Sequence, residues 1–76
     1  MNIRDLFFLV HCVGMQRKGQ RTCVPQKGYA TAAVRLEKAN LIARDPTVTR
    51  KPYGYIPTDK GYKVVNSAVR LMELAR

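Results

Sequence analysis

Residues 36–61 read LEKANLIARDPTVTRKPYGYIPTDKG, and this stretch decides the predicted fold. A charged helix end is followed by a short apolar run, a basic tip marked by prolines, and a tyrosine-rich return. Two short apolar runs separated by turn-forming residues are typical of the strands of a hairpin. We therefore predict strands at Leu41–Asp45 and Tyr53–Ile56, between one helix that ends before them and another that starts at Thr58.

Three helices are expected in total. The first begins at the N-cap Asn2 and runs to about residue 14 or 18, because apolar residues recur there at helical spacing. The second spans Gly28 to Asn40, whose final asparagine suits the left-handed residue that closes a helix. The third follows the Thr58 cap. Between the first two helices, Thr22–Pro25 has room for a single short turn.

The first and last helices are apolar over more of their circumference than one small core requires. We expect a partner subunit to cover the additional side. In the first helix the stripe at helical spacing comprises Ile3, Leu6, Phe7, Val10 and Val13, and the residues that widen it are Phe8, Leu9, Cys12 and Met15.

A family resemblance follows from the order of these pieces. A Leu-Glu pair, an Asn, a Leu-Ile-x-Arg run, a basic loop and a Thr-x-x-Gly helix start appear in succession. This order resembles the winged helix-turn-helix of MarR-type and PadR-type transcription regulators and of many small phage regulators. The residues that carry it are Leu36-Glu37, Asn40, Leu41–Arg44, Arg50-Lys51 and Thr58–Gly61.

The resemblance implies an α+β fold, a single winged-helix domain over residues 1–76 with about three helices and a two-stranded antiparallel wing. It also implies a DNA-binding transcriptional regulator on double-stranded DNA. The helix at about Gly28–Asn40 would lie in the major groove, and the basic wing would contact the backbone or the minor groove. A homodimer through the first and last helices would place two such units on half-sites about one helical turn apart. Relatives have a further helix before the recognition helix, for which this chain leaves little space.

The charge balance agrees with a polyanionic partner. The chain of 76 residues has 14 basic and 5 acidic residues, a net charge of +9. On so small a surface this charge favours nucleic acid. The alternative is a basic protein with no nucleic-acid role, because net charge alone is a weak indicator. The hydrophobic content of 46% is that of a folded domain and not of a disordered chain.

The candidate DNA contacts form three groups. Basic residues precede the presumed recognition helix, lie along its outer face, and mark the wing. Arginine and lysine can reach phosphates or base edges, and threonine can contact a thymine methyl. The outer face has few Asn, Gln or Ser residues, which favours backbone contact over base reading. For each basic residue the alternative is a solvated charge. The groups are Arg17, Lys18 and Arg21; Lys27, Thr31, Arg35 and Lys38; and Arg44, Arg50 and Lys51.

Other chemistries have little support in the sequence. His11 has no evident nucleophile or carboxylate partner in a motif, and no phosphate-binding glycine loop is present. No metal or cofactor motif is present, so we expect no cofactor and no enzymatic activity. Cys12 and Cys23 lack metal-ligand spacing and are expected to be reduced thiols in the cytoplasm. The apolar run Leu6–Val10 is far shorter than a membrane span.

Two alternatives remain open from the sequence. One is a phage-type winged-helix interaction module that binds and modulates a host protein, which the apolar Val34 on the outer helix face favours. The other concerns the four tyrosines, which can stack on single-stranded bases or close the core. We expect core roles for them. These are Tyr29, Tyr53, Tyr55 and Tyr62.

Overall fold

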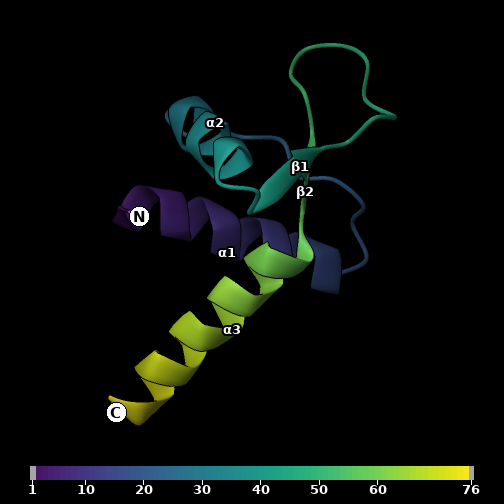
Figure 1. The fold of residues 1–76 in the computed structure, drawn as a ribbon. Coiled ribbons are helices and arrows are strands. Elements are labelled where there is room, and N and C mark those ends of the chain that lie inside the picture. The colour runs from purple at the N-terminus through teal and green to yellow at the C-terminus, as the bar shows by residue number, and fades with distance from the viewer. Residues whose placement is uncertain (1, 76) are drawn as a thin grey trace.

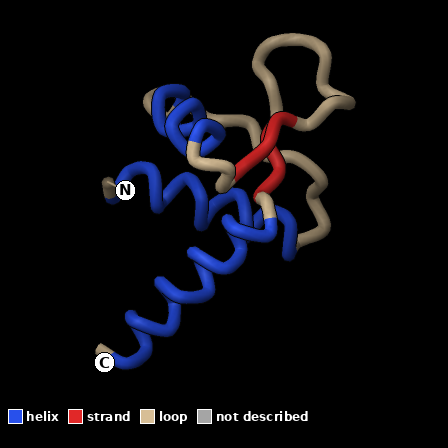
Figure 2. The backbone as a smooth tube through the Cα atoms, viewed as in Figure 1, coloured by secondary structure: helices blue, strands red, loops and turns tan. Residues whose placement is uncertain are grey.

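The structure, a computed structural model, describes residues 2–75. The helices surround a small sheet (Figures 1 and 2). In chain order these are α1 (Ile3–Arg17), α2 (Ala30–Lys38), β1 (Ile42–Arg44), β2 (Tyr55–Pro57) and α3 (Asp59–Leu74). Among the described residues, the predicted α+β class, three helices and two-stranded antiparallel sheet are confirmed.

The sheet joins two segments that are close in sequence with one that is distant. β1 and β2 pair antiparallel, with Ile42 opposite Pro57 and Arg44 opposite Tyr55. On the other edge of β2, the Cys23 N–H donates to the Tyr55 carbonyl at 2.9 Å, and the Tyr55 N–H donates back at 2.8 Å. The single short turn for which Thr22–Pro25 has room therefore does not form. The segment between α1 and α2 extends the sheet by one bridge because its backbone groups pair with β2.

The caps expected from the sequence are present. The Asn2 side chain accepts a hydrogen bond from the Asp5 N–H at 2.9 Å, at the start of α1. Thr58 caps α3 in the same way, accepting from the Gly61 N–H at 3.1 Å. Asn40 has a φ of 62° and ends the α2 region in the left-handed conformation. The helix α2 is shorter than predicted, because its first expected residue, Gly28, lies in a turn with φ of 96°.

The core uses mainly the face of α1 that was predicted to be the extension. Phe8, Leu9 and Cys12 of that extension are buried together with Val13 of the predicted stripe, and they pack against α2, the sheet and α3. In contrast, three members of the predicted stripe are on the surface: Ile3 is 70% exposed, Phe7 60% and Val10 40%. Helical periodicity indicated that α1 is apolar on more than one side. The contacts with the sheet, α2 and α3 determine which of these sides is buried. The other buried apolar residues are Cys23, Ala32, Ala33, Leu36, Leu41, Ile42, Tyr55 and Val65.

Helix α3 is fixed at its start and projects at its end. The Thr58 N–H donates to the Leu41 carbonyl at 3.1 Å. A Cβ built on Gly61 would lie 2.2 Å from the same carbonyl oxygen, so only glycine lets α3 approach β1 this closely. Further along, Val65 is buried, but Leu71 and Leu74 are 67% and 82% exposed. Figure 1 shows the last turns of α3 running away from the rest of the molecule.

A groove follows from this geometry on the side of α1 that faces α3. It has a volume of about 430 Å³ and is mainly apolar. We call it the α1–α3 groove, and it is lined by Leu6, Lys60, Lys63, Val64, Ser67, Ala68 and Leu71. No described helix combines the length and the apolarity that crossing a bilayer requires.

Candidate nucleic-acid interface

An ion pair between a buried carboxylate and a half-exposed guanidinium joins the N-terminal turn of α1 to α2. Asp5 is only 4% exposed, and both of its carboxylate oxygens accept from the Arg35 guanidinium, at 2.9 Å from Nε and 2.8 Å from Nη2. This hydrogen bonding lowers the pKa of Asp5 from its ordinary value of 3.8, against the opposing effect of burial. The same contact raises the pKa of Arg35. The pair fixes the orientation of α2 on α1.

A second buried carboxylate organises the loop between the strands. Asp45 is 1% exposed, and its Oδ1 accepts from the Thr47 N–H at 2.9 Å and from the Thr47 hydroxyl at 2.7 Å. The Asp45 N–H donates to the Gly54 carbonyl at 2.9 Å, which closes the base of the loop. The bonds from Thr47 lower the pKa of Asp45, while burial opposes them. Arg21 adds an ion pair, with its Nε 3.6 Å from Asp45 Oδ2.

All ten candidate DNA contacts lie on the surface, but four of them have side-chain partners within the protein. Arg35 and Arg21 pair with the two buried carboxylates. Arg17 donates to the Asn66 side-chain oxygen at 3.0 Å. The Arg44 guanidinium lies over the Tyr53 ring, 4.3 Å from its centroid. Among the described residues, the other six make no side-chain hydrogen bond or ion pair; they are Lys18, Lys27, Thr31, Lys38, Arg50 and Lys51.

The fold brings some of the candidates together and separates others. In Figure 1, α2 and the loop between β1 and β2 both lie above α1, whereas α3 lies below it. We call the exposed side of α2, its preceding turn and this loop the basic face. Arg17 belongs to the other side, because its partner Asn66 is on α3. The basic face comprises Lys27, Thr31, Lys38, Arg44, Arg50 and Lys51.

Arg35 is the candidate whose environment differs most from the sequence interpretation. It was expected to reach base edges or phosphates, yet the Nε–Nη2 edge of its guanidinium donates to both carboxylate oxygens of Asp5. The two residues are 30 positions apart, so no local pattern indicates the pairing. Asp5 and Asp45 are also the structural residues that sequence reasoning missed. The signal available was only that Asp5 lies in the first turn of a helix and that Asp45 lies at the end of a strand.

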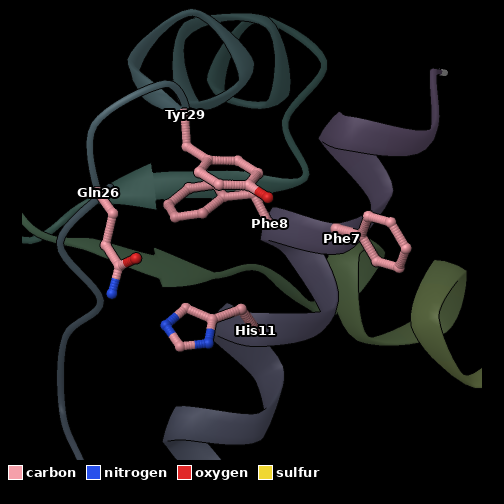
Figure 3. A pocket seen from close by; sticks show the side chains of 5 residues that line it. All are labelled: Phe7, Phe8, His11, Gln26 and Tyr29. Atoms are coloured by element: carbon pink, nitrogen blue, oxygen red, sulfur yellow. The ribbon is translucent and has the colours of Figure 1, made fainter.

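A small pocket lies between α1 and the segment before α2, as Figure 3 shows. The rings of Phe8 and Tyr29 stack with centroids 6.0 Å apart, and the side chains of His11 and Gln26 lie beside them. The pocket has a volume of about 180 Å³ and is partly open. Its lining includes no carboxylate and no hydroxyl nucleophile next to His11, so it lacks the paired groups of acid–base or nucleophilic catalysis.

The tyrosines and cysteines mostly serve the core. Tyr55 is buried, and Tyr29 and Tyr62 pack against the core cluster, which confirms the expected core roles of these three. Both cysteines are buried and free. The hydrogen bond with Cys23 and burial raise the pKa of the Cys12 thiol. Within residues 2–75, no three His, Cys, Asp or Glu side chains gather as a metal ion would require.

Comparison of the chain with protein-family profiles, with curated proteins and with solved structures found no match.

Proposed function

We propose that this protein is a DNA-binding transcriptional regulator that contacts double-stranded DNA through the basic face. Helix α2 would enter the major groove, and the loop between β1 and β2 would contact the backbone or the minor groove. The observation that carries the proposal is the distribution of charge. Of the five carboxylates, Asp5 and Asp45 are buried and paired with arginines, whereas the lysines of the basic face have no carboxylate partner in the described part of the chain.

The geometry of the basic face favours binding to phosphates. Lys27 lies in the turn before α2 and Lys38 ends the helix, so the two lysines flank one short helix. Arg50 and Lys51 are exposed in the loop whose base Asp45 closes. Charges at the helix ends and on a loop can follow a duplex backbone. With Arg35 held by Asp5, the middle of α2 presents Thr31 and Val34, which favours methyl contacts over hydrogen-bonded base reading.

A mobility-shift titration at several salt concentrations tests this proposal. The double variant Arg50→Ala/Lys51→Ala should bind a DNA duplex more weakly and reduce the slope of log K against log salt by about 1.8, from ~0.9 per lost phosphate contact. Lys63→Ala, which removes one exposed charge from α3, is the matched control and should leave the slope nearly unchanged. A wild-type protein that binds no duplex at low salt would contradict the proposal.

A homodimer is the second part of the proposal. The α1–α3 groove and the exposed Ile3, Phe7 and Val10 leave apolar surface uncovered on one chain. Exposed apolar patches of this kind are typical of association sites. A twofold dimer would bury these surfaces against each other and carry two basic faces on one assembly. We further propose a cytoplasmic, phage-type regulator, and the two free buried thiols are compatible with a reducing compartment.

The second candidate function is a module that binds a host protein. Val34 is 46% exposed in the middle of the outer face of α2, where an apolar side chain contributes little to phosphate binding. A pull-down that recovers one defined host protein, lost in Val34→Glu and retained in Arg50→Ala/Lys51→Ala, would favour this function. The reverse pattern in the mobility shift favours DNA.

A further inference from the structure

The last turn of α1 and the middle of α3 meet in a cleft that the basic face does not include. The cleft has a volume of about 330 Å³ and is lined by Arg17, Asn66, Ser67, Val69 and Arg70. These residues come from segments 49 positions apart, joined by the 3.0 Å hydrogen bond from Arg17 Nη2 to Asn66 Oδ1. In Figure 1 the last turn of α1 and the middle of α3 lie below the sheet, away from the loop between β1 and β2.

The donor groups at this cleft fit one kind of ligand. Two guanidinium groups, an amide and a hydroxyl face a common space, and Lys18 follows Arg17 directly. The Asn66 oxygen is used by Arg17, so its amide N–H₂ group is the part that can donate to a ligand. Within residues 2–75, no carboxylate lies within ion-pair distance of Arg17 or Arg70. Donors of this type around unneutralised positive charge are suited to a phosphate group.

We propose that this cleft, formed by Arg17, Asn66, Ser67 and Arg70, is a binding site for one phosphate group. The hydrogen bond that Arg17 donates to the Asn66 side-chain oxygen orients Arg17, and Arg70 lies one helical turn after Asn66 on the same side of α3. The phosphate can belong to a nucleic-acid backbone or to a small phosphorylated molecule. The site is separate from the basic face, and the inference does not depend on DNA binding by α2 and the loop.

Nuclear magnetic resonance of the ¹⁵N-labelled full chain tests the site. Inorganic phosphate, a nucleoside monophosphate and a short DNA duplex are added in separate titrations, with chloride at matched ionic strength as the reference. We expect saturable shifts of the Arg17 and Arg70 Nε–H signals and of the Asn66 side-chain amide with phosphate. Shifts of equal size with chloride would overturn the proposal.

Variants distinguish a defined phosphate-binding site from non-specific attraction to the positive charge of the chain. Arg70→Ala should weaken phosphate binding about tenfold, the effect of one charge-assisted hydrogen-bonding group. Arg70→Lys keeps the charge but loses the planar fork, and should weaken binding several-fold. Lys63→Ala should not change it. These side chains are exposed, so the variants keep the fold. Equal affinity of wild type, Arg70→Ala and Arg70→Lys would overturn the proposal.

The source of the phosphate follows from the duplex titration. If the duplex shifts the same signals at lower concentration than the monophosphate, and Arg70→Ala reduces its salt slope by about 0.9, the ligand is a nucleic-acid backbone. If only the small phosphates shift them, the ligand is a small phosphorylated molecule. The Arg50→Ala/Lys51→Ala variant distinguishes this site from the basic face, because it should keep the phosphate-induced shifts even where duplex binding is lost.

Discussion

The basic face and the α1–α3 groove lie on opposite sides of α1 and expose opposite kinds of side chain. On the basic face the lysines have no internal partners, while the two buried carboxylates, Asp5 and Asp45, are paired with arginines. In the groove, Leu6, Val64 and Leu71 contribute apolar surface that the core does not use. The comparison shows that the fold satisfies its buried charges internally and leaves two different surfaces uncovered. One suits a polyanion and the other suits a second protein surface.

The largest effect on stability is expected where α3 packs closely against the backbone at the start of β1. In Gly61→Ala the new methyl group would collide with the Leu41 carbonyl oxygen, 2.2 Å from the built Cβ position. We expect a loss of about 1–3 kcal/mol in the free energy of unfolding, as for other overpacked sites. Thermal or urea unfolding measures it.

The matched control is a glycine in the interior of α1. A Cβ on Gly14 would have no neighbour within 4 Å, so Gly14→Ala should stabilise the protein by roughly 0.5–1 kcal/mol through helix propensity. Two variants with equal stability would show that α3 does not depend on its close approach to β1.

Lowering the pH should destabilise the fold, because the two buried carboxylates that hold α2 and the loop between β1 and β2 become protonated. The folded-state pKa values of Asp5 and Asp45 lie below the ordinary 3.8, so the unfolded chain binds more protons than the folded one near that pH. Their stabilisation is complete above the ordinary pKa and is lost as the pH falls through the folded pKa values. We expect the melting temperature to fall by several degrees between pH 5 and pH 3.

Asp5→Asn tests the assignment of this acid sensitivity. It removes the charge that Arg35 engages, so its melting temperature should be lower at pH 5 and should change less on acidification than that of wild type. A wild-type melting temperature that is the same at pH 5 and pH 3 would contradict the internal neutralisation of the two carboxylates.

The smallest expected effect concerns the groove. Leu71→Glu places a charge on apolar surface that we assign to the dimer contact, and it should weaken self-association about tenfold or more in sedimentation equilibrium. Val24 is 41% exposed and lies outside the groove, so Val24→Glu is the matched control. A wild-type protein with the mass of one chain at micromolar concentration would contradict the proposed dimer contact in the groove.

Local sequence signals predicted the wing and its flanking helices. Asn40 and Thr58 act through their own backbone or that of near neighbours, so a short stretch of sequence contains the required information. The predicted strand bounds differ from the observed ones by only one or two residues, because the apolar runs are short and both end near prolines.

Long-range contacts are the part that the sequence did not reveal. The bridge between Cys23 and Tyr55, and the pair between Asp5 and Arg35, each join segments 30 or more positions apart. The buried face of α1 was also ambiguous, because both of its apolar stripes satisfy helical periodicity. The candidate site was predicted as a set of exposed basic residues. The sequence did not indicate that Arg17 contacts Asn66 on α3 or that Arg35 pairs with Asp5, and these contacts separate the two arginines from the basic face.

Helix α3 runs without interruption for 16 residues from the Thr58 cap. At 1.5 Å per residue its length is about 24 Å, and each residue turns it by about 100°. In the proposed dimer, this rigid rod would connect the contact between chains to the base of each hairpin. The separation and relative rotation of the two hairpins would then be set by the number of residues between Gly61 and Leu71. The length of α3 would thus determine the distance between the two half-sites that the dimer contacts.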